Sequence, residues 1–209
     1  LPLCIPMDAT WGRVRETGAA LWLLDTTALC SLAERVARQQ FLQSDRDPNA
    51  CLLLYAALGK TKVVAGLFKM KKDEKKYQFF MNDFSVDRWK LAASKNAYAL
   101  MKQQKYELAA AFFVLGGKVG EAARVVEKNM GDLQLALFII RIAERTATTD
   151  SNPRLAKNWV QTHLVDFARS QKDMWLLSIA FVLMEKTSEL PSVLVETVHA
   201  CPNGQPSRQ

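Results

Sequence analysis

The sequence contains little glycine and proline, and no part of it is of low complexity. Nine glycines and seven prolines among 209 residues are too few for a collagen-like or linker-dominated chain. About half of the residues are apolar, with abundant leucine and alanine, so the chain can bury a core of ordinary size. We therefore expect a globular protein.

Long hydrophobic runs are also missing. The longest, Met174 to Met184, is interrupted by Ser178 and reaches about half of the ~20 residues that a membrane-spanning helix requires. No cationic segment followed by an apolar one precedes a small-residue cleavage site. We expect no membrane span and no signal peptide. Because Leu1 stands in place of an initiator methionine, we expect the chain to be a piece of a longer protein.

The patterns that hold a metal ion or a redox centre are lacking as well. The four cysteines form no Cys-x-x-Cys pair and stand far apart, at Cys4, Cys30, Cys51 and Cys201. Scattered reduced thiols fit the cytosol, and we interpret Cys30 and Cys51 as small hydrophobic residues among leucines. His163 and His199 have no second ligand-type residue at metal spacing, so we predict no metal site.

Motifs for catalysis or nucleotide binding are absent too. There is no Gly-x-Ser-x-Gly, no complete Walker-type loop and no Gly-x-Gly-x-x-Gly after a strand. Gly59-Lys60-Thr61 lacks the upstream glycine of a phosphate loop, and we interpret Gly59 as a helix C-cap. The segment 82–89 gathers two carboxylates, an arginine and an indole, which fits a site or a helix start. We favour a helix start capped by Ser85, and we predict no enzymatic activity and no cofactor.

What the sequence does contain is helical periodicity. Apolar residues recur at spacings of three and four almost everywhere, while the alternation typical of strands is absent. We predict an all-α protein without a β-sheet. Helices are expected at about 26–41, 48–58, 61–70, 74–81, 86–104, 106–115, 119–130, 133–143, 154–170, 173–186 and 189–199, the one after Ser85 being the longest. The predicted caps are Asp25, Asp47, Ser85, Asp132, Asp173 and Ser188.

Helix faces and short connections indicate how the helices pack. One buried stripe is predicted at Leu29, Leu32, Ala33, Val36, Ala37 and Phe41, and another at Val86, Trp89, Ala93, Ala97 and Leu100. Small residues at Ala109, Ala110, Ala122, Ala123 and Ala136 allow helix axes to approach closely. Connections of two to four residues make successive helices antiparallel neighbours. We therefore predict an irregular α-solenoid of stacked antiparallel hairpins.

The expected organisation is a single helical-repeat domain over residues 1–200. The best internal loop is Thr146 to Pro153, which is polar and rich in turn-forming residues. Residues 201–209 contain two prolines, a glycine and almost no apolar residue, so we expect a flexible tail or linker there.

Positive charge is concentrated in one short stretch. Lys60 to Tyr77 contains seven lysines against Asp73 and Glu74, which accounts for +5 of the formal net charge of +7. The stretch can be a solvated helix face, a docking site for an acidic protein or an anionic lipid, or a nucleic-acid site. Base stacking would need interleaved aromatic residues, so we predict no nucleic-acid partner. The candidate binding residues are Lys69, Lys71, Lys72, Lys75 and Lys76.

A set of long, ordered motifs runs through the first two thirds of the chain. They are Arg46-Asp47-Pro48, Tyr55-Ala56-Ala57-Leu58, Gly66-Leu67-Phe68-Lys69, Asp73-Glu74-Lys75, Phe79-Phe80, Asn82-Asp83-Phe84, Asp87-Arg88-Trp89-Lys90, Lys95-Asn96-Ala97, Ala109-Ala110-Ala111-Phe112-Phe113 and Asp132-Leu133-Gln134-Leu135-Ala136. On these residues the chain resembles the rabconnectin and DmX-like family. The resemblance covers about 18–144 and continues more weakly over 173–181, whereas 146–172 match poorly.

The resemblance implies a role in binding other proteins. Its relatives are very large cytosolic proteins in which WD-repeat propellers precede a helical domain, and they include the largest subunit of the RAVE complex. That complex promotes reassembly of the peripheral sector of the vacuolar-type proton-pumping ATPase (V-ATPase) with its membrane-embedded sector. Animal relatives are linked to synaptic vesicles.

For this chain the resemblance implies a non-enzymatic scaffold of a RAVE-like complex that promotes V-ATPase assembly and organelle acidification. The implied partners are V-ATPase peripheral-sector subunits and other RAVE-type subunits. The implied location is cytoplasmic, with peripheral association with endosomal, vacuolar or synaptic-vesicle membranes. A general vesicle-trafficking scaffold with a basic membrane-docking patch is the alternative. No catalytic residues are implied.

Overall fold

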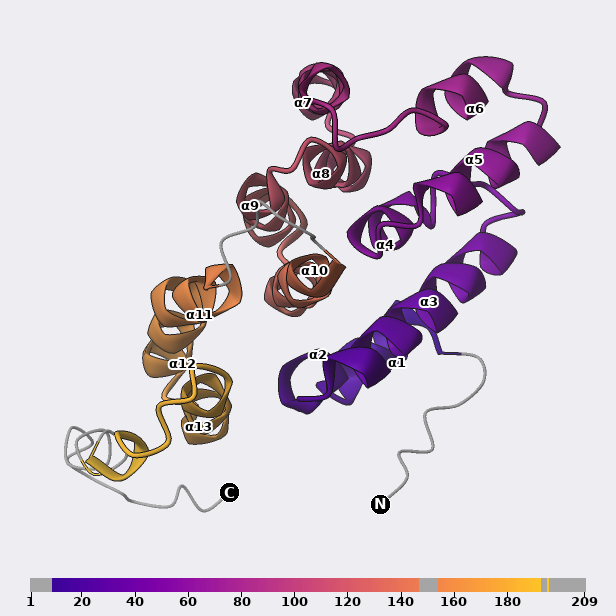
Figure 1. Ribbon diagram of the computed structural model, residues 1–209. Coiled ribbons are helices and arrows are strands. Elements are labelled where there is room, and N and C mark those ends of the chain that lie inside the picture. The colour runs from indigo at the N-terminus through magenta and orange to yellow at the C-terminus, as the bar shows by residue number, and fades with distance from the viewer. Residues whose placement is uncertain (1–8, 147–153, 193–194, 196–209) are drawn as a thin grey trace. The chain divides into compact units, whose positions relative to one another are not determined.

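A computed structural model describes residues 9–146, 154–192 and 195 of the chain. Every regular element in these ranges is a helix, and they contain no strand (Figure 1). The all-α prediction is therefore confirmed. The chain divides into two compact units, Leu1–Leu155 and Ala156–Gln209. The single domain expected over 1–200 stays a prediction, and the tail expected over 201–209 lies outside the described residues.

The first unit contains ten helices among its described residues. They are α1 (Trp11–Glu16), α2 (Ala19–Trp22), α3 (Thr26–Gln43), α4 (Leu52–Ala57), α5 (Thr61–Met70), α6 (Glu74–Phe80), α7 (Asp87–Lys102), α8 (Tyr106–Leu115), α9 (Val119–Met130) and α10 (Leu133–Thr146). The predicted bounds of α5, α8 and α9 are confirmed to the residue. The two short helices α1 and α2 were not predicted.

The second unit is built on one interrupted helix and its hairpin partner. The interrupted helix comprises α11 (Leu155–Trp159), the π-helical turn η1 (Val160–Leu164) and α12 (Val165–Gln171). After a left-handed Lys172, α13 (Met174–Leu183) packs back against α12 and η1. His163 lies half-buried on η1 and stacks on the indole of Trp159 at 5.1 Å between ring centroids. This agrees with its interpretation as an ordinary helix residue.

Four successive helices of the first unit, α7 to α10, pack in the order of the sequence. Each contacts the next, and the connections between them are only two or three residues long. The small residues predicted at these contacts, such as Ala110, Ala123 and Ala136, are fully buried. This row of helices is the hairpin stack that the short connections predicted.

A second layer lies against that row. α4 packs against both α8 and α10, and α10 also contacts α2 and α3 (Figure 1). Arg141 of α10 supplies a polar link, because its buried guanidinium donates hydrogen bonds to the carbonyls of Ala20 (2.8 Å) and Leu23 (2.6 Å). These contacts join segments more than 100 positions apart, so the first unit is folded back on itself.

Three predicted caps are confirmed by side-chain hydrogen bonds to backbone amides. Asp25 accepts from the amide of Thr27 at the start of α3, and Asp173 accepts from Leu176 at the start of α13. Asp132 accepts from the amide of Leu135 at 2.9 Å. Each carboxylate satisfies an amide that has no partner within its helix.

The prediction that Ser85 caps the longest helix is wrong. α7 begins at Asp87 after Val86, whose side chain forms no capping bond and is 49% exposed rather than on the buried face. Asp83 instead stabilises the turn before the helix, because its Oδ1 accepts a 2.8 Å hydrogen bond from the amide of Ser85. Among the described helices α3, with 18 residues, is longer than α7, with 16.

The predicted start of α4 also differs from the structure, and two other predicted segments lie mostly outside the described residues. α4 begins at Leu52, because Asp47 accepts from the amide of Asn49 and residues 48–51 form turns instead of a first helical turn. Most of the loop expected at Thr146 to Pro153 lies outside the described residues, and so does most of the helix expected at 189–199. Ser188, the predicted cap of that helix, lies in a turn. No helix in the described ranges is both long and apolar enough to cross a bilayer.

Candidate partner-binding site

The candidate lysines lie on a helical hairpin made by α5 and α6, which we call the basic hairpin (Thr61–Phe80). Its turn is tight, because Lys72 adopts a left-handed conformation (φ 59°) and the amide of Asp73 bonds back to the carbonyl of Phe68 at 3.0 Å. Asp73 then caps α6 by accepting from the amide of Lys76. Local hydrogen bonds therefore set the angle at which α6 returns along α5.

Aromatic packing holds the two helices of the hairpin together. The rings of Phe68 and Phe80 are stacked, with centroids 5.3 Å apart and planes 5° from parallel, and both side chains are buried. Phe79 extends the cluster toward α8, with its centroid 5.6 Å from that of Phe112. The lysines are thus carried by a backbone that packing has already ordered.

All five candidate lysines are exposed, and their surroundings differ. Lys71 Nζ lies 3.8 Å from Asp47 Oδ1, and Lys76 Nζ lies 3.5 Å from Asp73 Oδ2 and 4.9 Å from the centroid of Phe68. Lys69 Nζ lies 5.2 Å from the ring centroid of Tyr77. Exposed ion pairs of this kind contribute only about 0–1 kcal/mol, so a partner can replace them at little cost.

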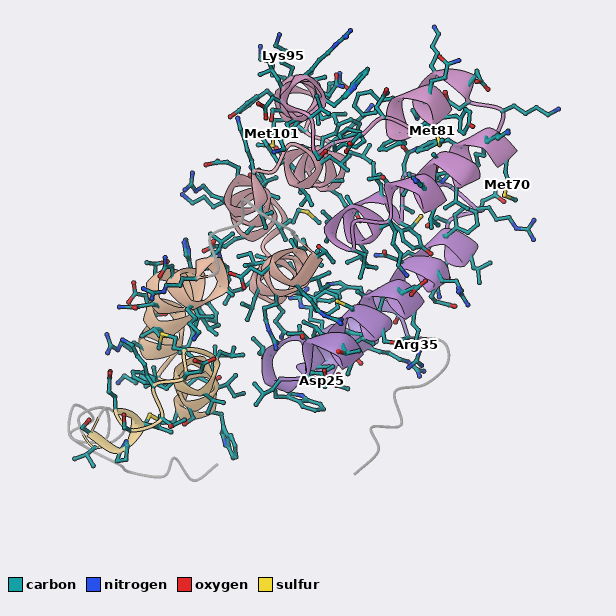
Figure 2. All side chains as sticks on the ribbon, in the orientation of Figure 1. Asp25, Arg35, Met70, Met81, Lys95 and Met101 are labelled. Atoms are coloured by element: carbon teal, nitrogen blue, oxygen red, sulfur yellow. The ribbon has the colours of Figure 1, made fainter. Side chains whose placement is uncertain are left out.

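Lys72 and Lys75 have no ion pair with any residue that the structure describes. Met70, the last residue of α5 and the neighbour of Lys71 in the sequence, is 73% exposed at the tip of the hairpin (Figure 2). The tip thus combines free cations with an apolar side chain.

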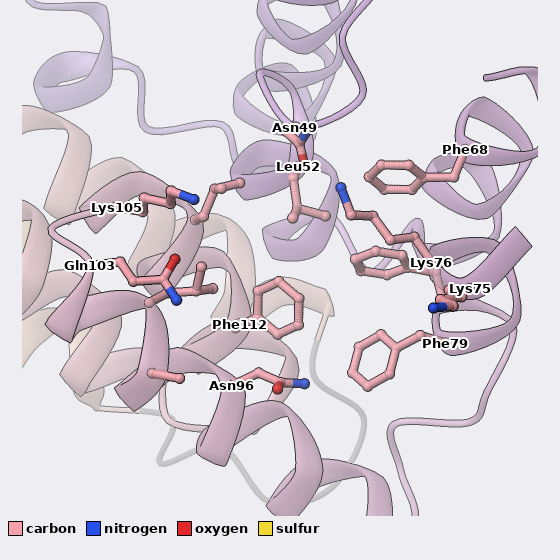
Figure 3. Close-up of a pocket in the computed structure, with 14 residues that line it drawn as sticks. Asn49, Leu52, Phe68, Lys75, Lys76, Phe79, Asn96, Gln103, Lys105 and Phe112 are labelled. Carbon is pink, nitrogen blue, oxygen red and sulfur yellow. The ribbon is translucent and has the colours of Figure 1, made fainter. Parts of the chain in front are cut away.

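A cavity of about 470 Å³ opens between the basic hairpin and the α7–α8 hairpin, and we call it the hairpin cavity (Figure 3). Its walls are largely apolar, with Leu52 of α4 and Phe68 and Phe80 of the hairpin buried. Phe79 and Phe112 line it as well and are half-exposed. Aromatic surface is therefore open to a ligand here.

The edge of the hairpin cavity is cationic. Lys75 and Lys76 stand on α6, and Lys105 stands across the opening just before α8 (Figure 3). Amide side chains of Asn96 and Gln103 also line the cavity, and none of its described lining residues is acidic. Only Lys75 and Lys76 belong to the predicted set. Lys105 could not be associated with them from the sequence, because it is 29 positions further along and joins them only through folding.

The segment 82–89 borders another cavity, of about 810 Å³, without forming a catalytic arrangement. The pKa of Asp83 is lowered by hydrogen bonds from the backbone and hydroxyl of Ser85, and Asp87 Oδ1 lies 3.9 Å from Lys90 Nζ. Each carboxylate thus has a local role at the start of a helix, as favoured from the sequence. The described residues contain no group of three or more side chains able to hold a metal ion.

Comparison with known proteins shows which family the chain belongs to. The family described as "RAVE protein 1 C terminal" matches residues 5–207. The chain belongs to this family. The matched range extends over both compact units and includes residues 146–172, which matched poorly in the resemblance described above.

Two of the relatives are named as regulators of V-ATPase. The chain is 31% identical over 182 residues to "Regulator of V-ATPase in vacuolar membrane protein 1" of Saccharomyces cerevisiae, covering 85% of this chain and 13% of the relative. The protein of the same name in Schizosaccharomyces pombe is 29% identical over 195 residues, 91% of this chain and 15% of the relative. "DmX-like protein 1" of Mus musculus is 38% identical over 144 residues, 69% of this chain and 5% of the relative. The chain thus spans a small fraction of each relative.

Proposed function

We propose that this chain is a non-enzymatic helical scaffold that regulates V-ATPase by promoting its assembly, and thereby organelle acidification. The observation that carries the proposal is the 31% identity, over 85% of the chain, to a protein named as a regulator of V-ATPase in the vacuolar membrane. The fission yeast relative has the same name and matches 91% of the chain.

The fold supports a scaffold physically. Helical hairpins that pack in sequence order expose extended faces, and a rigid face loses little conformational entropy when it binds. In the row α7 to α10 small and fully buried residues such as Ala110, Ala123 and Ala136 lie at the contacts, so little internal movement is left to be ordered by a partner. The chain therefore offers surface rather than chemistry.

The basic hairpin is the proposed contact for V-ATPase peripheral-sector subunits or other RAVE-type subunits. Its exposed lysines can steer and orient an acidic partner, while Met70 at the tip adds an apolar contact. The proposed location is cytoplasmic and peripheral to endosomal, vacuolar or synaptic-vesicle membranes, in line with the name of the yeast relative.

A co-purification experiment tests the scaffold and its contact together. The tagged chain is compared with a variant in which five hairpin lysines become glutamate: Lys69, Lys71, Lys72, Lys75 and Lys76. We expect the wild type to recover V-ATPase or RAVE-type subunits and the variant to lose them. The matched control reverses five exposed cations outside the hairpin: Lys95, Lys102, Lys118, Arg124 and Lys128. Recovery of trafficking proteins without pump subunits would contradict the assembly role.

The exposed tip also favours an alternative, a vesicle-trafficking scaffold that docks on anionic membranes. Free Lys72 and Lys75 beside an exposed Met70 suit such a surface, where each lysine contributes about 1 kcal/mol. Sedimentation with phosphatidylserine vesicles tests this function. Binding that weakens with salt and is lost in the hairpin variant would support it, and no sedimentation even at low salt would refute it.

A further inference from the structure

We infer that the hairpin cavity binds an acidic segment of a partner protein, which inserts a large apolar side chain into the cavity, against the rings of Phe79 and Phe112. The inference rests on the proposed scaffold function and narrows it to one cavity and one class of ligand. It adds Lys105, Asn96 and Gln103, which lie outside the basic hairpin, to the binding residues.

The walls of the hairpin cavity are apolar and aromatic, so they suit an apolar side chain. Phe79 and Phe112 are half-exposed with centroids 5.6 Å apart, above the buried Phe80 and Leu52. A cavity of about 470 Å³ falls within the usual range of ligand sites, about 300–1,000 Å³, and accommodates a large side chain. Burial of one such side chain contributes about 1.5–3 kcal/mol, so these walls supply an anchor.

The edges of the hairpin cavity are positively charged, so they suit an acidic segment. Lys75 and Lys76 lie on one side of the opening and Lys105 on the other, and none of the described lining residues is acidic. A segment that crosses the opening therefore meets cations before and after its anchor. Carboxylates that flank an apolar side chain match this arrangement.

The amides on the wall favour a peptide as the ligand. Asn96 of α7 and Gln103, which follows its last residue, each carry a donor and an acceptor and are exposed, so they can bond the backbone of an extended or helical segment. A bilayer would reach the hairpin tip at Met70 without entering a recess between two hairpins. A nucleic-acid strand would need a longer track of cations with interleaved stacking residues.

Ala99 allows the cavity to be closed without removing a core side chain. It lines the cavity from α7 and is exposed, so Ala99→Trp fills the space with an indole while leaving Phe79 and Phe112 in place. A second variant, Lys75→Glu with Lys105→Glu, reverses charge at both edges and leaves the walls intact. The matched control reverses Lys95 and Lys102, which are exposed on α7 and do not line the cavity.

The probe is a displayed library of short random peptides selected on the wild-type chain, followed by anisotropy titrations of the enriched peptides. We expect the enriched sequences to carry acidic residues on both sides of a large apolar residue. Ala99→Trp and the double lysine variant should each weaken their binding by about tenfold or more, and the control should bind as the wild type does. Circular dichroism verifies that each variant is folded.

Three results of the peptide experiment would overturn the inference. They are a library without enriched peptides, enriched peptides without acidic residues, and peptides that bind Ala99→Trp as tightly as the wild type. If the wild-type chain sediments with phosphatidylserine vesicles and Ala99→Trp abolishes this sedimentation, the cavity binds lipid instead. Pump subunits that still co-purify with Ala99→Trp would refute the cavity while leaving the scaffold function intact.

Discussion

The indole Nε1 of Trp11 donates a 2.7 Å hydrogen bond to Oδ2 of Asp132, 121 positions further along the chain. The other oxygen of the same carboxylate caps α10 through the amide of Leu135 at 2.9 Å. Asp132 is only 7% exposed, and Arg15 Nη1 lies 3.8 Å from its Oδ2. One side chain therefore both starts α10 and holds α1 against it.

Asp132→Ala should destabilise the first unit by about 2–4 kcal/mol. It removes a cap, for which about 1 kcal/mol is typical, and leaves the indole donor without its acceptor, for about 1–3 kcal/mol. Urea unfolding followed by circular dichroism measures the loss. Trp11→Phe removes only the indole bond and Asp132→Asn can retain the cap, so each should cost less. Equal losses in all three variants would contradict the double role.

Gly116→Ala should destabilise the contact between α7 and α8 by about 1–3 kcal/mol, as overpacking does. Gly116 has an ordinary φ of −76°, but an added Cβ would lie 2.5 Å from Ser94 Oγ and 3.1 Å from the carbonyl oxygen of Lys90. Thermal unfolding measures the effect, and Ser94→Ala in the same chain should recover part of it. Gly66→Ala is the control, because nothing lies within 4 Å of its added Cβ. It should stabilise α5 by about 0.5–1 kcal/mol.

Glu107→Gln should raise the melting temperature at neutral pH. Burial in the first turn of α8 raises the pKa of Glu107, so its charged form is less favourable in the folded chain than in the unfolded one. This cost is absent at acidic pH, where the carboxyl is protonated in both states, and develops as the pH rises through the ordinary pKa. Melting curves across this range should show a gap between variant and wild type that grows with pH. A gap independent of pH would contradict the assignment.

Cys51 should resist alkylation in the folded chain. Its thiol is fully buried, donates to the carbonyl of Pro48 at 3.4 Å, and has a pKa raised by burial to about 12. At pH 8 about one molecule in ten thousand then carries the thiolate, which is the reactive form. Peptide-resolved mass spectrometry after iodoacetamide treatment should find Cys51 unmodified until urea is added. Rapid native modification would show that the α4 region opens readily.

Most helices and several caps could be predicted because their determinants are local. Gly131 adopts the left-handed φ of 68° that ends α9, and Asp25 and Asp173 cap helices from positions next to them. Ser85 failed as a cap because its own amide and hydroxyl bond to the carboxylate of Asp83, two residues earlier, and α7 begins only at Asp87. Choosing between neighbouring caps requires backbone angles that composition does not determine.

The candidate site could be predicted only in part. The density of lysines located the basic hairpin, and its helices followed the expected bounds. The hairpin cavity needs Leu52, Phe112 and Lys105 from other helices, and only the packing of α4 against α8 brings them together. No local pattern predicts that contact, because it depends on how the two layers meet.

The hydrogen bonds from Arg141 to Ala20 and Leu23 bear on the order in which the first unit forms. On the ribosome these two carbonyls emerge long before the arginine is made. The C-terminal end of α2 therefore gains these two hydrogen bonds only after α10 has been synthesised. The contacts of α2 with α10 therefore form only after most of the first unit has been synthesised. A fragment that starts after Leu23 would lack both of these carbonyl acceptors, so α10 would lose the stabilisation that the two hydrogen bonds from Arg141 provide.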